Sequence, residues 1–153
     1  MRSSVEVHNY LQSMDIKHEM VALTGSVKNS ERMAELLGLD PACIMKVLVF
    51  IADGEPLMAL VPGDRHANLA KIKAATGTGK IFFAAEKDLV DITDYHSRCT
   101  PPVAWKAQVT TVADAALPAN SIVYTAGGQS NVVLKIRIVD LIKVTGAKLA
   151  DIT

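Results

Sequence analysis

The strongest constraint on the fold is a pair of apolar segments separated by a tight turn. The first, Ile44 to Ala52, is almost continuously apolar and β-branched, and the second runs from Leu57 to Val61. The dipeptide Asp53-Gly54 between them accepts the backbone angles that a short hairpin connection requires. These segments predict two neighbouring antiparallel strands at the centre of a sheet.

Short helical and strand-like segments alternate along the rest of the chain. The expected helices begin at a Ser3 or Ser4 cap, run from Ser30 to Gly38, follow an Asn68 cap, and cover 85–90 and 140–145. Further strands are expected at 17–23, 80–83, 107–112, 121–125 and 132–138. Strict βαβ alternation is absent, so we expect an α+β (mixed α/β) fold with a mixed, largely antiparallel central sheet flanked by helices.

The length and composition fit a single domain over residues 1–153. A chain of 153 residues, half of them hydrophobic, can bury one sizeable core without disulfides. No apolar stretch approaches the roughly 20 residues of a membrane span, and the first residues do not resemble a signal peptide. We therefore expect a cytoplasmic protein with no membrane association. Sixteen basic and sixteen acidic residues balance, which argues against binding nucleic acid by bulk charge.

Common catalytic signatures and metal-ligand spacings are absent. The chain has no G-x-S-x-G elbow, P-loop, G-x-G-x-x-G turn or H-E-x-x-H helix. Its two cysteines are far apart and its four histidines do not fall at ligand spacings. We therefore predict no metal site and no cofactor.

Lys46 stands out because it interrupts the first apolar segment, where a charge is costly unless it is paired or directed into a cleft. One interpretation is functional, with the ammonium holding a ribose hydroxyl, a phosphate or a carbonyl oxygen that gains charge during attack. The other is structural, with the aliphatic stem packed and the amine reaching water. The residue alone does not decide between them.

Three further loops can also be interpreted as either functional or structural. Gly127-Gly128 follows a predicted strand, where its backbone N–H groups could hold a ligand or form a simple turn. Asp64, in the loop after the second central strand, is a candidate partner for Lys46. His96 and Cys99 share a loop that could hold a nucleophilic thiolate or be a polar surface segment with an incidental thiol.

Five segments, taken in order, resemble the YbaK/ProX family, and the resemblance covers nearly the whole chain. The segments are 31–38 (ERMAELLG), 46–50 (KVLVF), 61–64 (VPGD), 124–128 (YTAGG) and 140–141 (DL). The family includes freestanding proteins and the editing domain inserted in bacterial prolyl-tRNA synthetases, which remove wrongly attached amino acids such as Ala or Cys from tRNA. The resemblance implies that Lys46 positions the tRNA 3′ end and that Gly127 and Gly128 hold the aminoacyl group.

The implied function is a trans-editing aminoacyl-tRNA deacylase that hydrolyses the ester of a mischarged tRNA, such as an Ala- or Cys-tRNA(Pro)-like substrate. Its expected partners are the tRNA 3′ aminoacyl end and an aminoacyl-tRNA synthetase. The expected reaction relies on positioning of the ester and needs no protein nucleophile. A separate editing step of this kind is useful because one methylene more or less in the amino acid changes its binding free energy by only about 1 to 3 kcal/mol.

The segment 93–102 departs from the family pattern T-G-Y-x-x-G-G-x-x-P. Thr93, Tyr95 and Pro102 match, and we include Thr93 and Tyr95, with Asp64, among the predicted substrate-binding residues. Three glycines are replaced, by Asp94, Arg98 and Cys99, which restricts the backbone and adds bulk. The alternative function is therefore a non-catalytic relative that binds an aminoacyl-tRNA end, a nucleotide or a synthetase.

Overall fold

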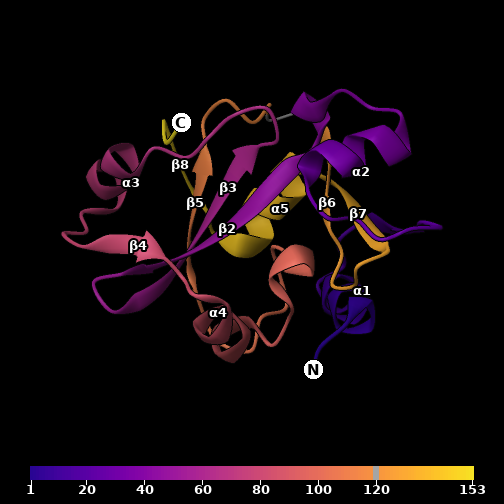
Figure 1. Ribbon diagram of the computed structural model, residues 1–153, viewed down its shortest axis with the longest axis horizontal. Coiled ribbons are helices and arrows are strands. Elements are labelled where there is room, and N and C mark those ends of the chain that lie inside the picture. The colour runs from indigo at the N-terminus through magenta and orange to yellow at the C-terminus, as the bar shows by residue number, and fades with distance from the viewer. Residues whose placement is uncertain (119–120) are drawn as a thin grey trace.

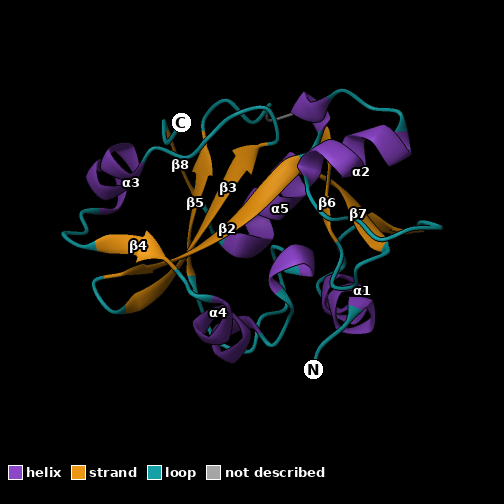
Figure 2. Cartoon of the chain, in the orientation of Figure 1, coloured by secondary structure: helices purple, strands orange, loops and turns teal. Residues whose placement is uncertain are grey.

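The computed structural model describes residues 1–118 and 121–153, and its strands form two sheets (Figures 1 and 2). The larger sheet has the order β4-β2-β3-β5-β8, with β2 at Met45–Ala52, β3 at Glu55–Pro62, β4 at Ile81–Phe83, β5 at Thr110–Asp114 and β8 at Lys148–Ala150. The smaller sheet has the order β1-β7-β6, with β1 at His18–Ala22, β6 at Ile122–Ala126 and β7 at Val132–Arg137. Four of the six strand pairs are antiparallel.

Helices surround the two sheets. They are α1 (Ser4–Ser13), α2 (Ser30–Leu37), α3 (Leu69–Thr76), α4 (Glu86–Thr93) and α5 (Ile138–Thr145), with two 3₁₀ turns, η1 (Pro41–Cys43) and η2 (Ser97–Cys99). In Figure 1, α5 lies behind the larger sheet, α3 lies beside β4, and α1 lies at the end of the smaller sheet. The predicted α+β class is confirmed. No helix within the described ranges is long and apolar enough to cross a membrane.

The predicted central hairpin is present as β2 and β3. The two strands pair from Ala52 opposite Glu55 to Met45 opposite Pro62. Asp53 and Gly54 both have positive φ angles, 49° and 82°, as the tight turn requires. The Asp53 carboxylate also accepts hydrogen bonds from the backbone N–H groups of Gly79 and Lys80, which lower its pKa and tie the start of β4 to the turn.

The beginning of β2 joins the two sheets. Ile44, just before β2, forms a parallel bridge with Tyr124 of β6. The buried Thr125 hydroxyl donates to the backbone oxygen of Met45 at 2.9 Å. These two contacts hold the start of the central hairpin beside the end of β6, although β2 and β6 belong to different sheets.

Three apolar clusters form the core. The largest lies between the two sheets, α1 and α5, and includes Leu60, Leu134 and Leu141. The second covers the opposite face of the sheet beneath α3, around Phe50 and Ile72. The third lies beneath α2. The aromatic content is low, so aliphatic side chains make most of these contacts.

Two details of the predicted strands were wrong. The strand expected at 107–112 begins only at Thr110, where pairing with Leu57 of β3 starts. The preceding residues form a loop in which Ala104 has a left-handed φ of 62° and the Trp105 indole donates to the Pro101 backbone oxygen. The three-residue strand β8 was not predicted, because so short a segment has no periodicity to detect.

Candidate functional site

A cleft of about 360 Å³ lies where β2, β6, α2 and η2 meet. The five residues from Ile44 to Leu48 form one wall, with Thr125 and Ala126 beside them. The opposite wall is made by Ser97, Arg98 and Thr100, and the segment 27–31 closes one side. The cleft therefore combines segments from four distant parts of the chain, including the strand that carries Lys46.

Lys46 lies on this wall with its side chain half buried. Its Nζ donates a hydrogen bond to the backbone oxygen of Arg65, in the loop after β3. Loss of hydration lowers the pKa of the ammonium, and the nearby carboxylates of Glu31 and Asp64 oppose this shift. The arrangement supplies a partly desolvated cation fixed by a backbone acceptor, which is suited to binding an oxygen with negative charge.

The loop 93–102 forms the second wall. At position 94, where the family pattern has its first glycine, the backbone has a conformation that suits glycine. Asp94 has a φ of 63°, the left-handed conformation that glycine adopts freely and aspartate tolerates better than most residues. Arg98 and Cys99, in contrast, do not have positive φ angles. The replacements at 98 and 99 therefore add side chains without forcing strained backbone angles.

Arg98 and Cys99 face different surroundings. The Arg98 side chain is exposed, lines the cleft, and forms none of the ion pairs found among the described residues. Cys99 is buried, and its Sγ lies 3.6 Å from the His96 backbone oxygen. Burial raises the pKa of the Cys99 thiol, which disfavours a thiolate. Among the described residues, no hydrogen bond joins the Cys99 thiol to an imidazole, and Cys99 does not line the Lys46 cleft.

Thr93 and Tyr95 lie beneath the loop instead of lining the cleft. Both are fully buried. The Tyr95 backbone N–H donates to Thr93 Oγ1 at 3.0 Å, and the Tyr95 hydroxyl donates to the Ala104 backbone oxygen at 3.0 Å. Burial raises the pKa of Tyr95. The structure gives these two residues contacts that position the loop, and Tyr95 does not cross the cleft.

Gly127 and Gly128 sit at a crowded junction beside the cleft. A Cβ on Gly127 would come within 2.8 Å of the Val132 backbone oxygen, and one on Gly128 within 2.9 Å of the Ser3 backbone. Gly128 also has a φ of 97°. The Gly127 N–H donates to Val132 and the Gly128 N–H donates to the backbone oxygen of Cys99. Their amides are therefore engaged within the protein, unlike the ligand-facing groups that the sequence suggested.

The remaining predicted position, Asp64, lies on the surface outside the residues that line the cleft. It acts on Lys46 through its charge, and no ion pair joins the two within the described contacts. Its neighbour His66 is also exposed.

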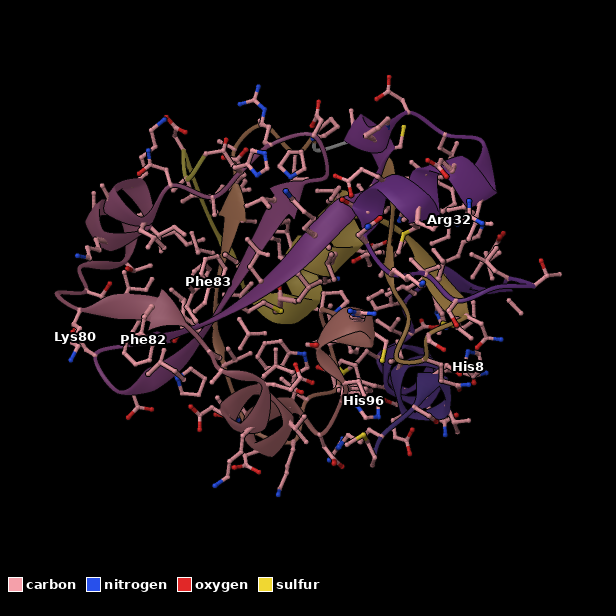
Figure 3. All side chains as sticks on the ribbon, in the orientation of Figure 1. His8, Arg32, Lys80, Phe82, Phe83 and His96 are labelled. Atoms are coloured by element: carbon pink, nitrogen blue, oxygen red, sulfur yellow. The ribbon has the colours of Figure 1, made fainter. Side chains whose placement is uncertain are left out.

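Sequence reasoning missed the wall formed by Lys28, Asn29, Ser30 and Glu31. The local signal was the polar cap of the α2 helix, where Asn29 Oδ1 accepts from the Arg32 N–H at 2.8 Å. The matching segment 31–38 includes Glu31 but did not place it in a cleft. A cap predicts where a helix begins but not what faces it. Figure 3 labels Arg32 on α2 and His96 beside η2.

The model of the aminoacyl-tRNA editing domain family matches residues 24–144. A proline–tRNA ligase from Citrifermentans bemidjiense is 35% identical over 94 residues, which are 61% of this chain and 16% of the ligase. The chain thus spans about a sixth of the length of such ligases. A protein from Enterococcus faecalis, described provisionally as a Cys-tRNA(Pro)/Cys-tRNA(Cys) deacylase, is 26% identical over 126 residues, which are 82% of this chain and 77% of that protein.

Solved structures match the fold along nearly the whole chain. The crystal structure of a protein described only as hypothetical gives a TM-score of 0.90 at 26% identity, covering 96% of this chain and 98% of that one. A protein described provisionally as a trans-editing enzyme for prolyl-tRNA synthetase gives 0.89 at 24% identity, covering 98% and 96%. The predicted resemblance to the YbaK/ProX family is confirmed.

Proposed function

The chain belongs to the aminoacyl-tRNA editing domain family, and from this premise we propose that it is a deacylase that hydrolyses the ester of a mischarged tRNA in trans. The proposed substrates are Ala- or Cys-tRNA(Pro)-like. The Enterococcus faecalis relative, named for Cys-tRNA(Pro), supports this substrate class. The observation that carries the proposal is the open cleft in which Lys46 faces the 97–100 loop.

In the proposed reaction, water attacks the ester carbonyl carbon and the bond to the ribose oxygen breaks. The products are the free amino acid and the tRNA with its terminal hydroxyl restored. Negative charge grows on the carbonyl oxygen as water adds, and a fixed ammonium such as that of Lys46 stabilises it more than the neutral ester. Because the Arg65 carbonyl holds Nζ, the cation needs little reorganisation during the reaction.

The other predicted residues have indirect roles in this proposal. Thr93 and Tyr95 support the loop that carries Arg98. Gly127 and Gly128 allow close packing against Val132 and Ser3, and the Gly128 N–H bonds the loop at the Cys99 backbone oxygen. Asp64 adjusts the electrostatics of Lys46 from the surface. Arg98 adds bulk and charge to the wall where the family pattern has glycine, so we assign to it the choice among aminoacyl groups.

Recognition of the rest of the tRNA requires further contacts. The chain has no net charge, so its own binding to tRNA should be weak and sensitive to salt. The cations at the cleft, Lys28, Lys46 and Arg98, face only one carboxylate there, that of Glu31. We therefore propose local binding of the 3′ end, with a synthetase as the partner that supplies tRNA specificity.

The test is release of amino acid from a panel of mischarged tRNAs, including Ala- and Cys-tRNA(Pro). Lys46→Ala should lower the rate about 100-fold or more, as removal of a single oxyanion-stabilising donor does in other enzymes. Lys71→Ala is the matched control, because Lys71 pairs with Asp151 on the surface away from the cleft. Its rate should equal that of the unaltered protein.

Two outcomes would contradict the proposal. Equal release by the unaltered protein and Lys46→Ala on every substrate would remove Lys46 from the mechanism. Absence of release from any charged tRNA would favour the non-catalytic alternative, in which the altered loop binds an aminoacyl-tRNA end without hydrolysing it.

A further inference from the structure

The face of β2 that carries Lys46 continues beyond the cleft to an exposed aromatic ring on β4. Side chains alternate along a strand, so Lys46, Leu48 and Phe50 point to the same face. Lys46 and Leu48 line the cleft, and Leu48 belongs with Phe50 to the apolar cluster beneath α3. Phe83 lies directly opposite Phe50 and therefore shares this face. The stretch of β2 from Lys46 to Phe50 is about 13 Å long.

The Phe83 ring is fixed on one side and open on the other. It packs against the fully buried Phe50, with the ring centroids 4.4 Å apart and the ring planes inclined by 34°. Phe83 nevertheless remains 57% exposed. The protein thus holds a flat aromatic surface in a defined orientation that a ligand can reach. Such a preformed surface limits the ordering that binding requires.

The neighbouring Phe82 belongs to the other face of the sheet. It lies opposite Ile51 and is 46% exposed, and the Lys80 ammonium lies 6.0 Å from the centroid of its ring. Figure 3 labels Phe82 and Phe83 on β4. Because the two rings point to opposite faces, they do not form one apolar patch of the kind that a protein partner covers. A single exposed ring on a strand, in line with a cleft, suits the stacking of an unpaired base.

The surface between the cleft and Phe83 leaves room for a chain to pass. In Figure 1 no helix lies in front of β2 between its start beside α2 and its end beside β4. The cleft end of this path has the excess of cations described above, which suits phosphate, and the far end has the aromatic ring. The two ends together match a short unpaired strand of RNA, which carries both phosphates and flat bases.

We propose that the unpaired 3′ end of the tRNA crosses this face of β2, with its terminal ribose and ester at Lys46 and the base of a preceding nucleotide stacked on Phe83. This inference rests on the proposed deacylase function and specifies how the substrate lies. Every base has a flat π face, so stacking on Phe83 accepts any sequence. Phe83 therefore strengthens binding of the unpaired end and takes no part in the choice of aminoacyl group.

The experiment compares a mischarged tRNA with an aminoacyl-adenosine, which carries the same ester but lacks the preceding nucleotides. Phe83→Leu keeps an apolar contact with Phe50 but removes the flat ring, so KM for the charged tRNA should rise about five-fold or more. Its kcat should stay within about two-fold, because stacking is equally strong before and during the reaction. With aminoacyl-adenosine the variant should match the unaltered protein. Phe83→Tyr, which keeps a ring, should restore KM for the charged tRNA.

Phe82→Leu is the matched control, because it makes the same change to an exposed ring of the same strand on the opposite face. Its KM for the charged tRNA should stay within about two-fold of the unaltered protein. A second readout does not depend on hydrolysis. Fluorescence anisotropy of a labelled RNA oligonucleotide with the sequence of a tRNA 3′ end should show weaker binding to Phe83→Leu, by about the same factor as KM, and unchanged binding to Phe82→Leu.

The outcomes separate this inference from the proposed function. Lys46-dependent release, with KM and oligonucleotide binding unchanged in Phe83→Leu, would overturn the inference and leave the proposed function intact. Equal losses in Phe82→Leu and Phe83→Leu would also overturn it, as would a Phe83-dependent dimer in analytical ultracentrifugation with unchanged RNA binding. In a protein that releases no amino acid, Phe83-dependent binding of the oligonucleotide would support the RNA path and contradict only the proposed function.

Discussion

The two walls of the Lys46 cleft are held in place by different kinds of contact. The strand wall belongs to β2, which pairs along its length with β3, and to β6, which pairs with β7, and the Thr125 hydroxyl ties these two strands together. The loop wall is a single 3₁₀ turn fixed by a few contacts, such as Thr100 Oγ1 with the His96 backbone oxygen and the Gly128 N–H with Cys99. The strand wall therefore fixes geometry, and the loop wall can exchange side chains without disturbing it.

The three replaced glycines show the same division within the loop itself. Asp94 occupies a left-handed position and keeps the turn, so its replacement preserves backbone geometry. Arg98 occupies an ordinary backbone position and places a charged side chain in the cleft. The loop thus keeps a left-handed turn at position 94, while Arg98 presents a charged side chain to the cleft.

The Gly128 N–H is one of the contacts that fix the loop wall, and Gly128→Ala tests whether the packing of this residue against the Ser3 backbone requires glycine. This variant should have the largest effect on stability. The new Cβ would meet the Ser3 backbone at 2.9 Å, at a residue with positive φ. We expect a loss of about 2 kcal/mol or more in the free energy of unfolding, measured by urea denaturation. Gly25→Ala is the control, because nothing lies within 4 Å of its Cβ. Similar stability of the two variants would show that the junction relaxes without cost.

Arg98→Gly tests whether the loop wall selects the substrate. Removing the side chain enlarges the cleft and removes a cation, so relative rates among aminoacyl groups should change about ten-fold. The free energy of unfolding should change by less than about 1 kcal/mol, because the side chain is exposed. Arg98→Ala separates the loss of the side chain from the added flexibility of glycine. Unchanged selectivity in both variants would assign the choice of substrate to another part of the cleft.

Alkaline pH should destabilise the protein through two buried groups of the 93–102 loop. Burial raises the pKa values of both Cys99 and Tyr95 above the ordinary values of 9.0 and 10.0, so each is more readily ionised when unfolded. Their contribution to stability is complete below about pH 9 and is lost as the pH rises, by up to about 1.4 kcal/mol per pH unit for each group. Urea midpoints between pH 8 and 11 measure this slope. Cys99→Ser with Tyr95→Phe should flatten it, and an equal slope in that double variant would contradict the assignment.

Cys99→Ser should have the smallest effect on activity. The thiol is buried, bonds to a backbone oxygen and does not line the Lys46 cleft. We therefore expect deacylation rates within about two-fold of the unaltered protein in the same charged-tRNA assay. A loss comparable with that of Lys46→Ala would restore the thiol as a nucleophile.

Local signals in the sequence predicted much of the fold. The Asp53-Gly54 turn, the Asn68 cap and the left-handed Gly38 and Gly146 at helix ends all lie where the sequence placed them. Each depends on the conformational preference of one or two residues, which hardly changes with the surroundings. The strand after Trp105 was misplaced because its start depends on a partner strand more than 50 residues away.

For the site, the sequence by itself determined that a charge stands within an apolar strand and that glycines follow another strand. Only the tertiary structure decided that Lys46 shares a cleft with Arg98, that the Gly127 and Gly128 amides are already bonded, and that Phe83 is exposed on the same face of the sheet as Lys46. These are properties of which segments meet in space. Because burial and pairing are set by contacts between residues far apart in the chain, no local pattern contains them.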